Sequence, residues 1–336
     1  MEMVNQTSFV AERIVLQDKS GRDILVVIVK CTYSIEGKGH LVPAEVQVPI
    51  QMADDFYGEP GESSVRYESD LALKKVGTDI VLLGHAYSQG SKSPHVDVSL
   101  KVGALQSTVR VFGDRRWDKV LGITRISSPE PFERIPLVYE RAYGGKDLSS
   151  PDPKHHEHEA RNPVGRGFRA KKSKQEIEGM LIPNLEDPAH LIRDIDHRPE
   201  PVGFGFIGRH WQPRMSFAGT YDEAWMKNRC PLLPDDFDDR YFNGAHPKLV
   251  SRQYLQGNEP VEVLNASVKG MLRFSLPGDR PDVVVTIAEE DNSLQMNFDT
   301  LIIEPDENRV MMVWRGNQDI YNRLYQVKKI EVMAHG

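Results

Sequence analysis

The chain has 336 residues, of which 39% are hydrophobic and 27% are charged, and its formal net charge is −7. This composition supports a substantial buried core and excludes a largely disordered chain. A negative net charge disfavours general binding to polyanions, so we expect no nucleic-acid partner.

Targeting and redox signals favour a cytoplasmic protein that does not bind a membrane. The N-terminus lacks a basic start followed by an apolar stretch, so we expect no secretory signal. The longest apolar runs, Ile24–Val29 and Val283–Ile287, are much shorter than the roughly 20 residues that a membrane-spanning helix needs. Cys31 and Cys230 belong to no Cys-x-x-Cys pair, which predicts two free thiols.

Residues 1–128 form a first predicted region, and their pattern is that of β-strands. Ile24–Cys31 is an apolar run rich in β-branched residues. Further strands are expected at Ile80–Ala86, Val96–Val102 and Ser107–Phe112. Along Val96–Val102 apolar and polar residues alternate, the period of a half-buried strand.

Residues 129–247 form a second predicted region, which we expect to be ordered but irregular. Pro, Gly, Asn and Asp recur every few residues, yet aromatic residues stay frequent, unlike in disordered linkers. One short helix is expected at Tyr221–Asn228, capped by Thr220 or Asp222. The basic residues between Arg166 and Lys174 are expected on a solvated loop.

Residues 248–336 form a third predicted region, in which strands resume. They are expected at Glu262–Ala266, Gly270–Ser275 and Val283–Ala288, with a hairpin that joins Thr300–Ile303 to Arg309–Trp314. A last amphipathic stretch, Tyr321–Val332, fits a strand or a helix. The expected fold is mainly β, with antiparallel sheets in a sandwich or barrel-like arrangement, a long irregular Pro/Gly-rich central segment and little helix. The three regions can also form one continuous domain.

The segment Gly203–Gly208 matches Gly-x-Gly-x-x-Gly, the pattern of a dinucleotide-binding turn. That function needs a buried strand before the glycines and a helix after them. Pro201 precedes the glycines, and Pro213 would interrupt a following helix. We therefore expect no cofactor, and we expect the glycines to permit close packing between aromatic residues, so that Gly205→Val disturbs folding.

Two polar clusters contain suitable ligands but lack the required spacing. The histidines of His155–His158 lie on a Pro-rich loop without the H-E-x-x-H spacing, so we expect no metal. The four aspartates of Asp235–Asp239 lack the glycine and final glutamate of a calcium loop, which favours turns and a solvated face. No motif nominates a catalytic site.

Longer sequence blocks resemble one bacterial family. In chain order they are VVIVKCTYSI, LVPAEVQVP, SSVRYESDLALKKVGTDIVLLGHA, VRVFGDRRW, YERAYGG, NPVGRGF, IPNLEDP, GFGFIGRHWQPR, AGTYDEAWMKNRCPLLPDDFDDRYFN and LPGDRPD. From about Ile24 to Pro277 the chain resembles the type VI secretion accessory family that is catalogued as domain of unknown function 2169.

The resemblance implies a cytoplasmic adaptor or chaperone in a Gram-negative bacterium. Such a protein would bind a toxin effector, its PAAR-like tip carrier or both, and assist their loading onto the VgrG spike. The family has no catalytic motif to transfer, so the resemblance implies no enzymatic activity. The alternatives are a hydrolase or carbohydrate-active enzyme that uses the Asp-rich loop, and a structural tip component that leaves the cell with the spike.

Five residues are the candidates for contact with a partner: Arg166, Trp211, Arg214, Tyr221 and Trp225. Trp, Tyr and Arg dominate the binding energy of protein interfaces. The competing interpretation for all but Arg166 is packing in the core.

Overall fold

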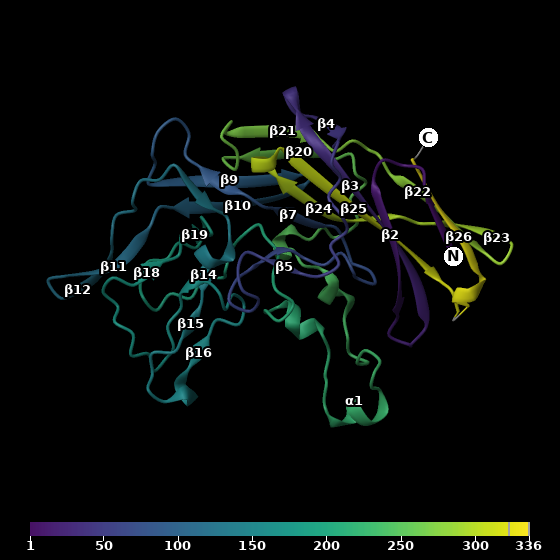
Figure 1. Ribbon diagram of the computed structural model, residues 1–336. Helices are drawn as coiled ribbons and strands as arrows, with labels where there is room; N and C mark the ends of the chain where they lie inside the picture. Colours follow the sequence, from purple (N-terminus) through teal and green to yellow (C-terminus); the bar gives the residue numbers. More distant parts are fainter. Residues whose placement is uncertain (322, 335–336) are drawn as a thin grey trace.

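The computed structural model describes residues 1–321 and 323–334. Within these residues the only α-helix is α1 (Glu223–Asn228), and most other regular structure is β. The larger sheets lie across the upper part of Figure 1, and much of the irregular central segment, residues 129–247, lies below them. The predicted mainly β fold is confirmed, with several antiparallel sheets and no closed barrel among the described residues.

The largest sheet has six strands. Its order is β2 (Val10–Gln17), β3 (Asp23–Glu36), β25 (Arg309–Asp319), β24 (Asn297–Glu304) and β7 (Asp79–Leu82), with β4 (His40–Pro43) also beside β3. Only the β24–β7 pair is parallel within this sheet. The predicted C-terminal hairpin is β24–β25.

Two further sheets complete the main body. The five-stranded sheet has the order β19 (Leu185–Glu186), β10 (Leu105–Phe112), β9 (His95–Val102), β20 (Pro260–Leu264) and β21 (Met271–Ser275). The four-stranded sheet has the order β1 (Glu2–Asn5), β26 (Val327–Ala334), β22 (Pro281–Ile287) and β23 (Glu290–Leu294). Of the ambiguous stretch Tyr321–Val332, the part from Val327 onward is the strand β26 and Leu324–Gln326 is a short 3-10 helix, whereas residue 322 lies outside the described residues.

Smaller elements decorate this body. One sheet has three strands, β12 (Ile123–Ile126), β11 (Arg115–Val120) and β18 (Leu181–Ile182). The two-stranded pairs are β5 (Asp55–Phe56) with β6 (Val65–Tyr67), β8 (His85–Tyr87) with β13 (Arg134–Pro136), β14 (Tyr143–Gly144) with β17 (Arg166–Gly167), and β15 (Lys146–Asp147) with β16 (Glu157–His158). Short 3-10 helices lie at Gly37–Gly39, Tyr139–Arg141, Pro153–His155, Arg214–Phe217, Asp239–Phe242, Pro247–Leu249, Pro305–Glu307 and Leu324–Gln326.

The central strand β3 is buried on both faces. Alternate residues such as Val27 and Val29 join the main core, whereas Val26 and Ile28 join a second cluster on the opposite face. Leu73, which belongs to an irregular stretch, packs into that second cluster. Because side chains alternate between the faces of a strand, β3 requires a cover on each side, and the irregular segments supply one of them.

The main core is shared by the three predicted regions. It includes Val29 from residues 1–128, Phe204 from residues 129–247 and Val285 from residues 248–336. In β9 the alternation predicted from the sequence is present, with Val98 and Leu100 fully buried.

The glycine segment connects no strand to a helix. Phe204 and Phe206 are buried, and the carbonyl of Phe204 accepts a hydrogen bond from the amide of Leu82 in β7. The expected close approach is real at Gly208, where an added Cβ would lie 2.9 Å from Nε1 of Trp211. It is wrong at Gly205, whose added Cβ would meet only ordinary contacts at 3.9 Å or more.

Candidate partner-binding surfaces and the buried polar network

Trp211 lies in the core, not on a surface. The residue is 1% exposed, and its ring packs edge-on against Tyr139 with the centroids 5.6 Å apart. Its Nε1 donates a hydrogen bond of 3.0 Å to Nε2 of His210. Burial therefore corrects the assignment of Trp211 as a partner contact, and the competing core interpretation applies.

Arg214 is also buried, and it joins three separate segments. Its guanidinium donates to the carbonyls of Tyr241 and Ile207 over 2.7 and 2.8 Å, and it pairs with Glu68. A buried charge is tolerated only when it is paired in this way. The prediction that Arg214 contacts a partner is therefore wrong, because its guanidinium is buried and donates to groups inside the protein.

Arg166 is half-buried in β17. Its Nε donates to the carbonyl of Glu140 over 3.1 Å, and its guanidinium lies 3.8 Å from Asp114. Burial, together with the charge of Arg141, lowers the pKa of Arg166 below its ordinary value. Part of this side chain stays exposed, so Arg166 keeps its place among the predicted partner contacts.

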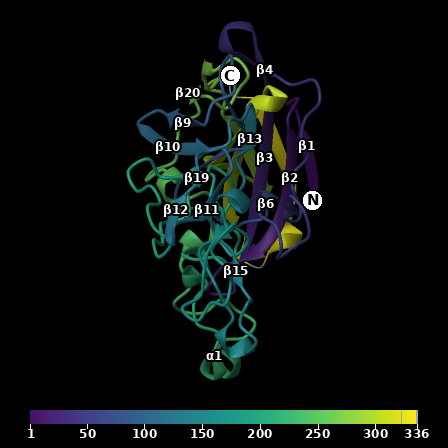
Figure 2. The same ribbon diagram turned by 90° about the vertical axis from the view of Figure 1, so that its left-hand side faces the viewer.

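Tyr221 and Trp225 lie on an arm, residues 213–241, that projects from the sheets with α1 at its far end (Figures 1 and 2). The predicted helix is present, and Asp222 caps it by accepting a hydrogen bond of 2.8 Å from the amide of Trp225. The rings of Tyr221 and Trp225 pack with centroids 4.7 Å apart. The predicted helix is therefore confirmed, but it begins at Glu223 and not at Tyr221, and of the two expected caps it uses Asp222.

Hydrogen bonds fix the arm both to the body of the protein and across its own width. Arg229 donates to the carbonyl of Lys19, and the Lys19 ammonium donates to the carbonyl of Phe237 over 3.0 Å. Thr220 donates to Asp236 over 2.7 Å and closes the arm across its width. The two bonds of Lys19 attach the arm to the turn between β2 and β3, and the bond of Thr220 holds the two sides of the arm together.

The arm carries apolar side chains that the protein itself does not cover. Tyr221 is 54% exposed, Met226 is 69% exposed and Met215 is 55% exposed. Trp225 is partly covered, because its Nε1 donates to the carbonyl of Leu232 over 2.9 Å. Exposed aromatic and Met side chains on a fixed support are typical of protein-binding surfaces.

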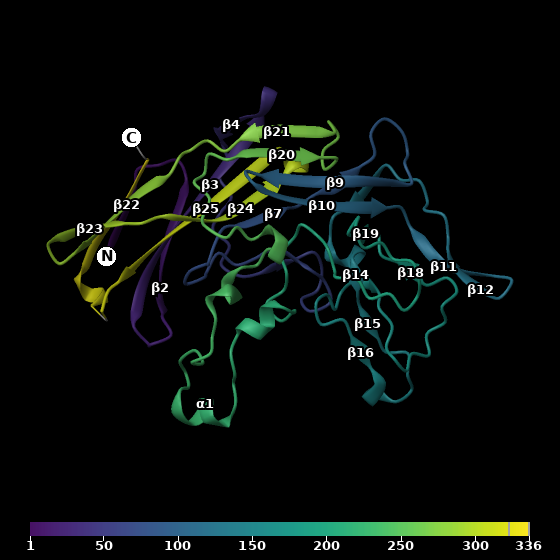
Figure 3. The same ribbon diagram turned by 180° about the vertical axis from the view of Figure 1, so that it is seen from behind.

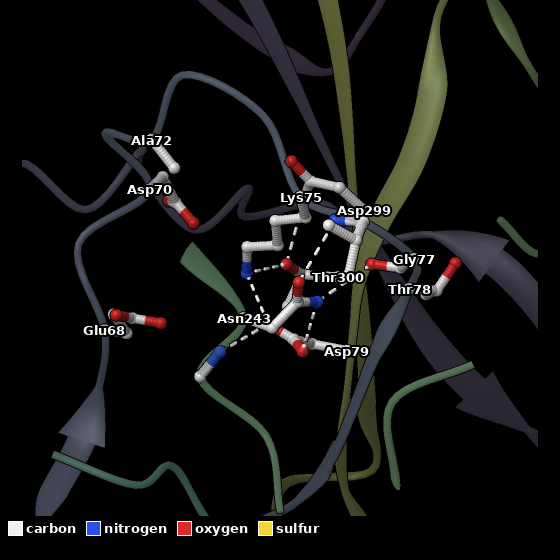
Figure 4. Close-up of polar contacts among 12 residues, drawn as sticks. Glu68, Asp70, Ala72, Lys75, Gly77, Thr78, Asp79, Asn243, Asp299 and Thr300 are labelled. Carbon is white, nitrogen blue, oxygen red and sulfur yellow. Dashed lines mark hydrogen bonds and ion pairs between the residues drawn. The ribbon is translucent and has the colours of Figure 1, made fainter. Parts of the chain in front are cut away.

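A buried polar network lies on the face of the large sheet that the irregular segments cover. Residues paired across the strands share one face, and here Lys30, Thr300 and Asp79 belong to the same cross-strand row. The Lys75 ammonium donates to Asp79 and Thr300 over 2.7 Å each, as Figure 4 shows. Asn243 donates to Asp79 over 2.9 Å, which attaches the segment that follows the arm.

Lys75 holds its charge inside the protein. Burial alone lowers its pKa, but the neighbouring carboxylates of Asp79 and Asp299 raise the pKa above its ordinary value. A protonated amine that donates to two oxygens is not a nucleophile. Because the network joins the stretch around Lys75 and the segment around Asn243 to the large sheet, we interpret it as a structural anchor.

Two further ion pairs extend this anchor. Arg315 pairs with Asp299 and donates to the carbonyls of Ala72 and Asp70 over 2.9 and 2.8 Å. Lys30 lies 2.9 Å from a carboxylate oxygen of Asp70. Charged side chains of β3, β24 and β25 thus hold the stretch around residues 70–79 against the sheet.

The other polar clusters singled out in the sequence have structural partners. His156 lies 2.9 Å from the carbonyl of Ser150, and no group of three or more His, Cys, Asp or Glu side chains in residues 1–321 and 323–334 is arranged to hold a metal. In the Asp-rich loop, Asp238 caps the 3-10 helix of Asp239–Phe242 and Asp239 pairs with Lys74. The predicted turn chemistry is confirmed for this loop.

A cleft of 440 Å³ lies beside β24 and β8. Asp306 accepts hydrogen bonds of 2.7 Å from Tyr87 and from Nδ1 of His85, and Glu304 pairs with Arg309. Sequence reasoning missed this cleft, because its residues come from distant segments and match no motif. Its two central carboxylates are occupied by partners from the protein.

Comparison with known protein families gives a match over most of the chain. The bacterial family DUF2169, described as an uncharacterized protein conserved in bacteria, matches residues 20–315. No curated protein and no solved structure matches the chain. In the described part of the chain, no helix is both long and apolar enough to cross a lipid bilayer.

Proposed function

Because the chain belongs to the DUF2169 family, we propose that it is a type VI secretion adaptor or chaperone. In this proposal it binds a toxin effector, its PAAR-like tip carrier or both in the cytoplasm of a Gram-negative bacterium. It then assists their loading onto the VgrG spike. The proposal extends the resemblance found in the sequence, and the surface of the protein supports it.

The observation that carries the proposal is the arm with its uncovered apolar side chains. Tyr221 and Met226 are exposed at its end, whereas Asp222, Arg229 and Thr220 fix its shape. A preformed apolar surface loses little conformational entropy on binding, which favours capture of a partner. The four aspartates that motivated the enzyme alternative are used in turns and ion pairs instead.

Co-purification tests the proposal. The tagged protein is produced together with the toxin and tip proteins encoded beside its gene, and the eluate is separated by size-exclusion chromatography. We expect at least one of these proteins to co-elute with it. Recovery of this protein with the secreted spike would favour the structural-tip alternative, and elution of every protein alone would contradict both roles.

A further inference from the structure

The hairpin β11–β12 projects from the body at the end opposite the two chain termini (Figures 1 and 3). Its two strands pair from Trp117 with Ile126 to Val120 with Ile123, and a two-residue turn, Leu121–Gly122, connects them. The base of the hairpin is anchored, since Trp117 and Ile126 pack with Ile182 in a small apolar cluster. The tip has no such support.

The tip exposes a strained apolar residue. Leu121 is 98% exposed and has a φ of 50°, in the left-handed region. This conformation is unfavourable for a residue with a side chain, and Asn or Gly usually occupies such a turn. Ile123 is 70% exposed beside it. The paired strands β11 and β12 hold this turn, but in residues 1–321 and 323–334 no side chain covers Leu121, and its exposure points to a contact outside the chain.

One edge of the hairpin is open. β12 is the terminal strand of its sheet, so no described strand pairs with its outer side. The bond from the Ser127 amide to the Arg116 carbonyl and the tight turn fix which residues of β12 bond inward. The N–H and C=O of Thr124 therefore face away from β11, available to another strand.

The hairpin is basic although the whole chain is acidic. Lys119 and Arg125 are exposed, and no ion pair joins either to a residue that the structure describes, although Asp118 lies opposite Arg125 in the strand register. Arg116 has a partner, Glu130, at 3.5 Å. From Arg115 to Ile126 the basic residues outnumber the single carboxylate of Asp118. This excess of positive charge beside an open edge favours an acidic strand and disfavours pairing with a second copy of the same basic edge.

We propose that β12 captures an extended acidic segment of the partner protein by strand addition. The segment pairs with the outer edge at Thr124, places a carboxylate beside Arg125 and packs an apolar side chain on Leu121 and Ile123. This inference rests on the proposed adaptor function and assigns it a binding element.

The test is a matched pair of substitutions in the co-expression experiment with the neighbouring toxin and tip proteins. Thr124→Pro removes the outward N–H and leaves the bonds to β11 intact, whereas Thr124→Val keeps that N–H. We expect Thr124→Pro to weaken the affinity at least about tenfold and Thr124→Val to change it less than about twofold. Leu121→Asn should raise the melting temperature, because Asn tolerates a positive φ, and should weaken binding.

The outcomes separate this inference from the adaptor function. If the wild type co-elutes with a neighbour and Thr124→Pro binds it as tightly, strand addition is wrong and the adaptor function stands. A dimer of this protein that Thr124→Pro abolishes would show a second copy on β12 and overturn the acidic partner. If the wild type co-elutes with no neighbour, both proposals are overturned.

Discussion

Gly205 and Gly208 belong to the same motif but carry different constraints. A Cβ at Gly208 would lie 2.9–3.0 Å from three ring atoms of the buried Trp211, whereas a Cβ at Gly205 has room. We expect Gly208→Ala to lower the free energy of unfolding by about 1–3 kcal/mol, as overpacking does. Gly205→Ala, the matched control, should change it by less than about 1 kcal/mol in the same urea titration. Equal losses would show that Trp211 gives way easily.

His246 makes stability depend on pH. It is buried, its Nδ1 accepts the amide of Lys248 over 3.2 Å, and burial lowers its pKa. Below pH ~6.5 the unfolded chain takes up a proton that the folded chain does not, so stability is full above that pH and falls as the pH decreases.

His246→Asn keeps an acceptor for this amide and removes the titrating group. Between about pH 7.5 and 5.5 the wild type should lose up to about 1 kcal/mol more of its unfolding free energy than the variant. Chemical unfolding at the two pH values measures this difference. Parallel losses in both proteins would exclude His246 as the cause.

At the level of single residues, the sequence did not reveal the contacts of the buried network or which aromatic side chains are exposed. Lys30 interrupts an apolar strand, and that interruption was the available signal of the buried network. Its partner Asp70 lies 40 residues away in an irregular stretch, where no periodicity predicts a contact. Trp211 and Tyr221 are both large aromatic residues, and only the fold separates a core position from an exposed one.

At the scale of elements, we expect substitutions at the exposed end of the arm to weaken binding and substitutions at its buried base to weaken folding. Tyr221→Ala should leave the melting temperature almost unchanged and weaken a partner's affinity by about 2 kcal/mol, since exposed aromatic side chains are common hot spots. Arg214→Ala, at the base of the arm, should cost about 1.5–3 kcal/mol of stability, because it removes charged hydrogen bonds and leaves buried Glu68 with only Arg209, at 3.3 Å, as its paired cation among the described residues. Thermal unfolding and titration with a co-purified neighbour measure both. Full affinity in Tyr221→Ala would remove it from the interface.

Predicting these elements depended on local signals. β9 and the hairpin β24–β25 were predictable because alternation and a turn signal lie within a few residues. The hairpin β11–β12 was not, since Arg115–Val120 is mostly polar and its turn places Leu at a positive φ. β1 and β2 were missed as well, because neither has a long apolar run; tertiary pairing with β26 and β3 establishes them.

For the whole molecule, the shared core predicts cooperative folding that does not require a metal. The apolar cluster joins residues from the beginning, middle and end of the chain, and the ion pairs attach the irregular segments to it. Treatment with a chelator should leave the melting temperature unchanged in a thermal scan. A decrease of many degrees would reveal a structural metal and contradict this prediction.

The most direct test of the adaptor role measures the fate of the partner. Each neighbouring toxin and tip protein is produced with and without this chain, and its soluble fraction is compared. A partner that binds only when folded gains about 2.7 kcal/mol of stability when the free adaptor is at 100 Kd. We predict that at least one neighbour is markedly more soluble in its presence and co-elutes with it. Equal solubility of every neighbour alone, with no co-elution, would contradict the adaptor role.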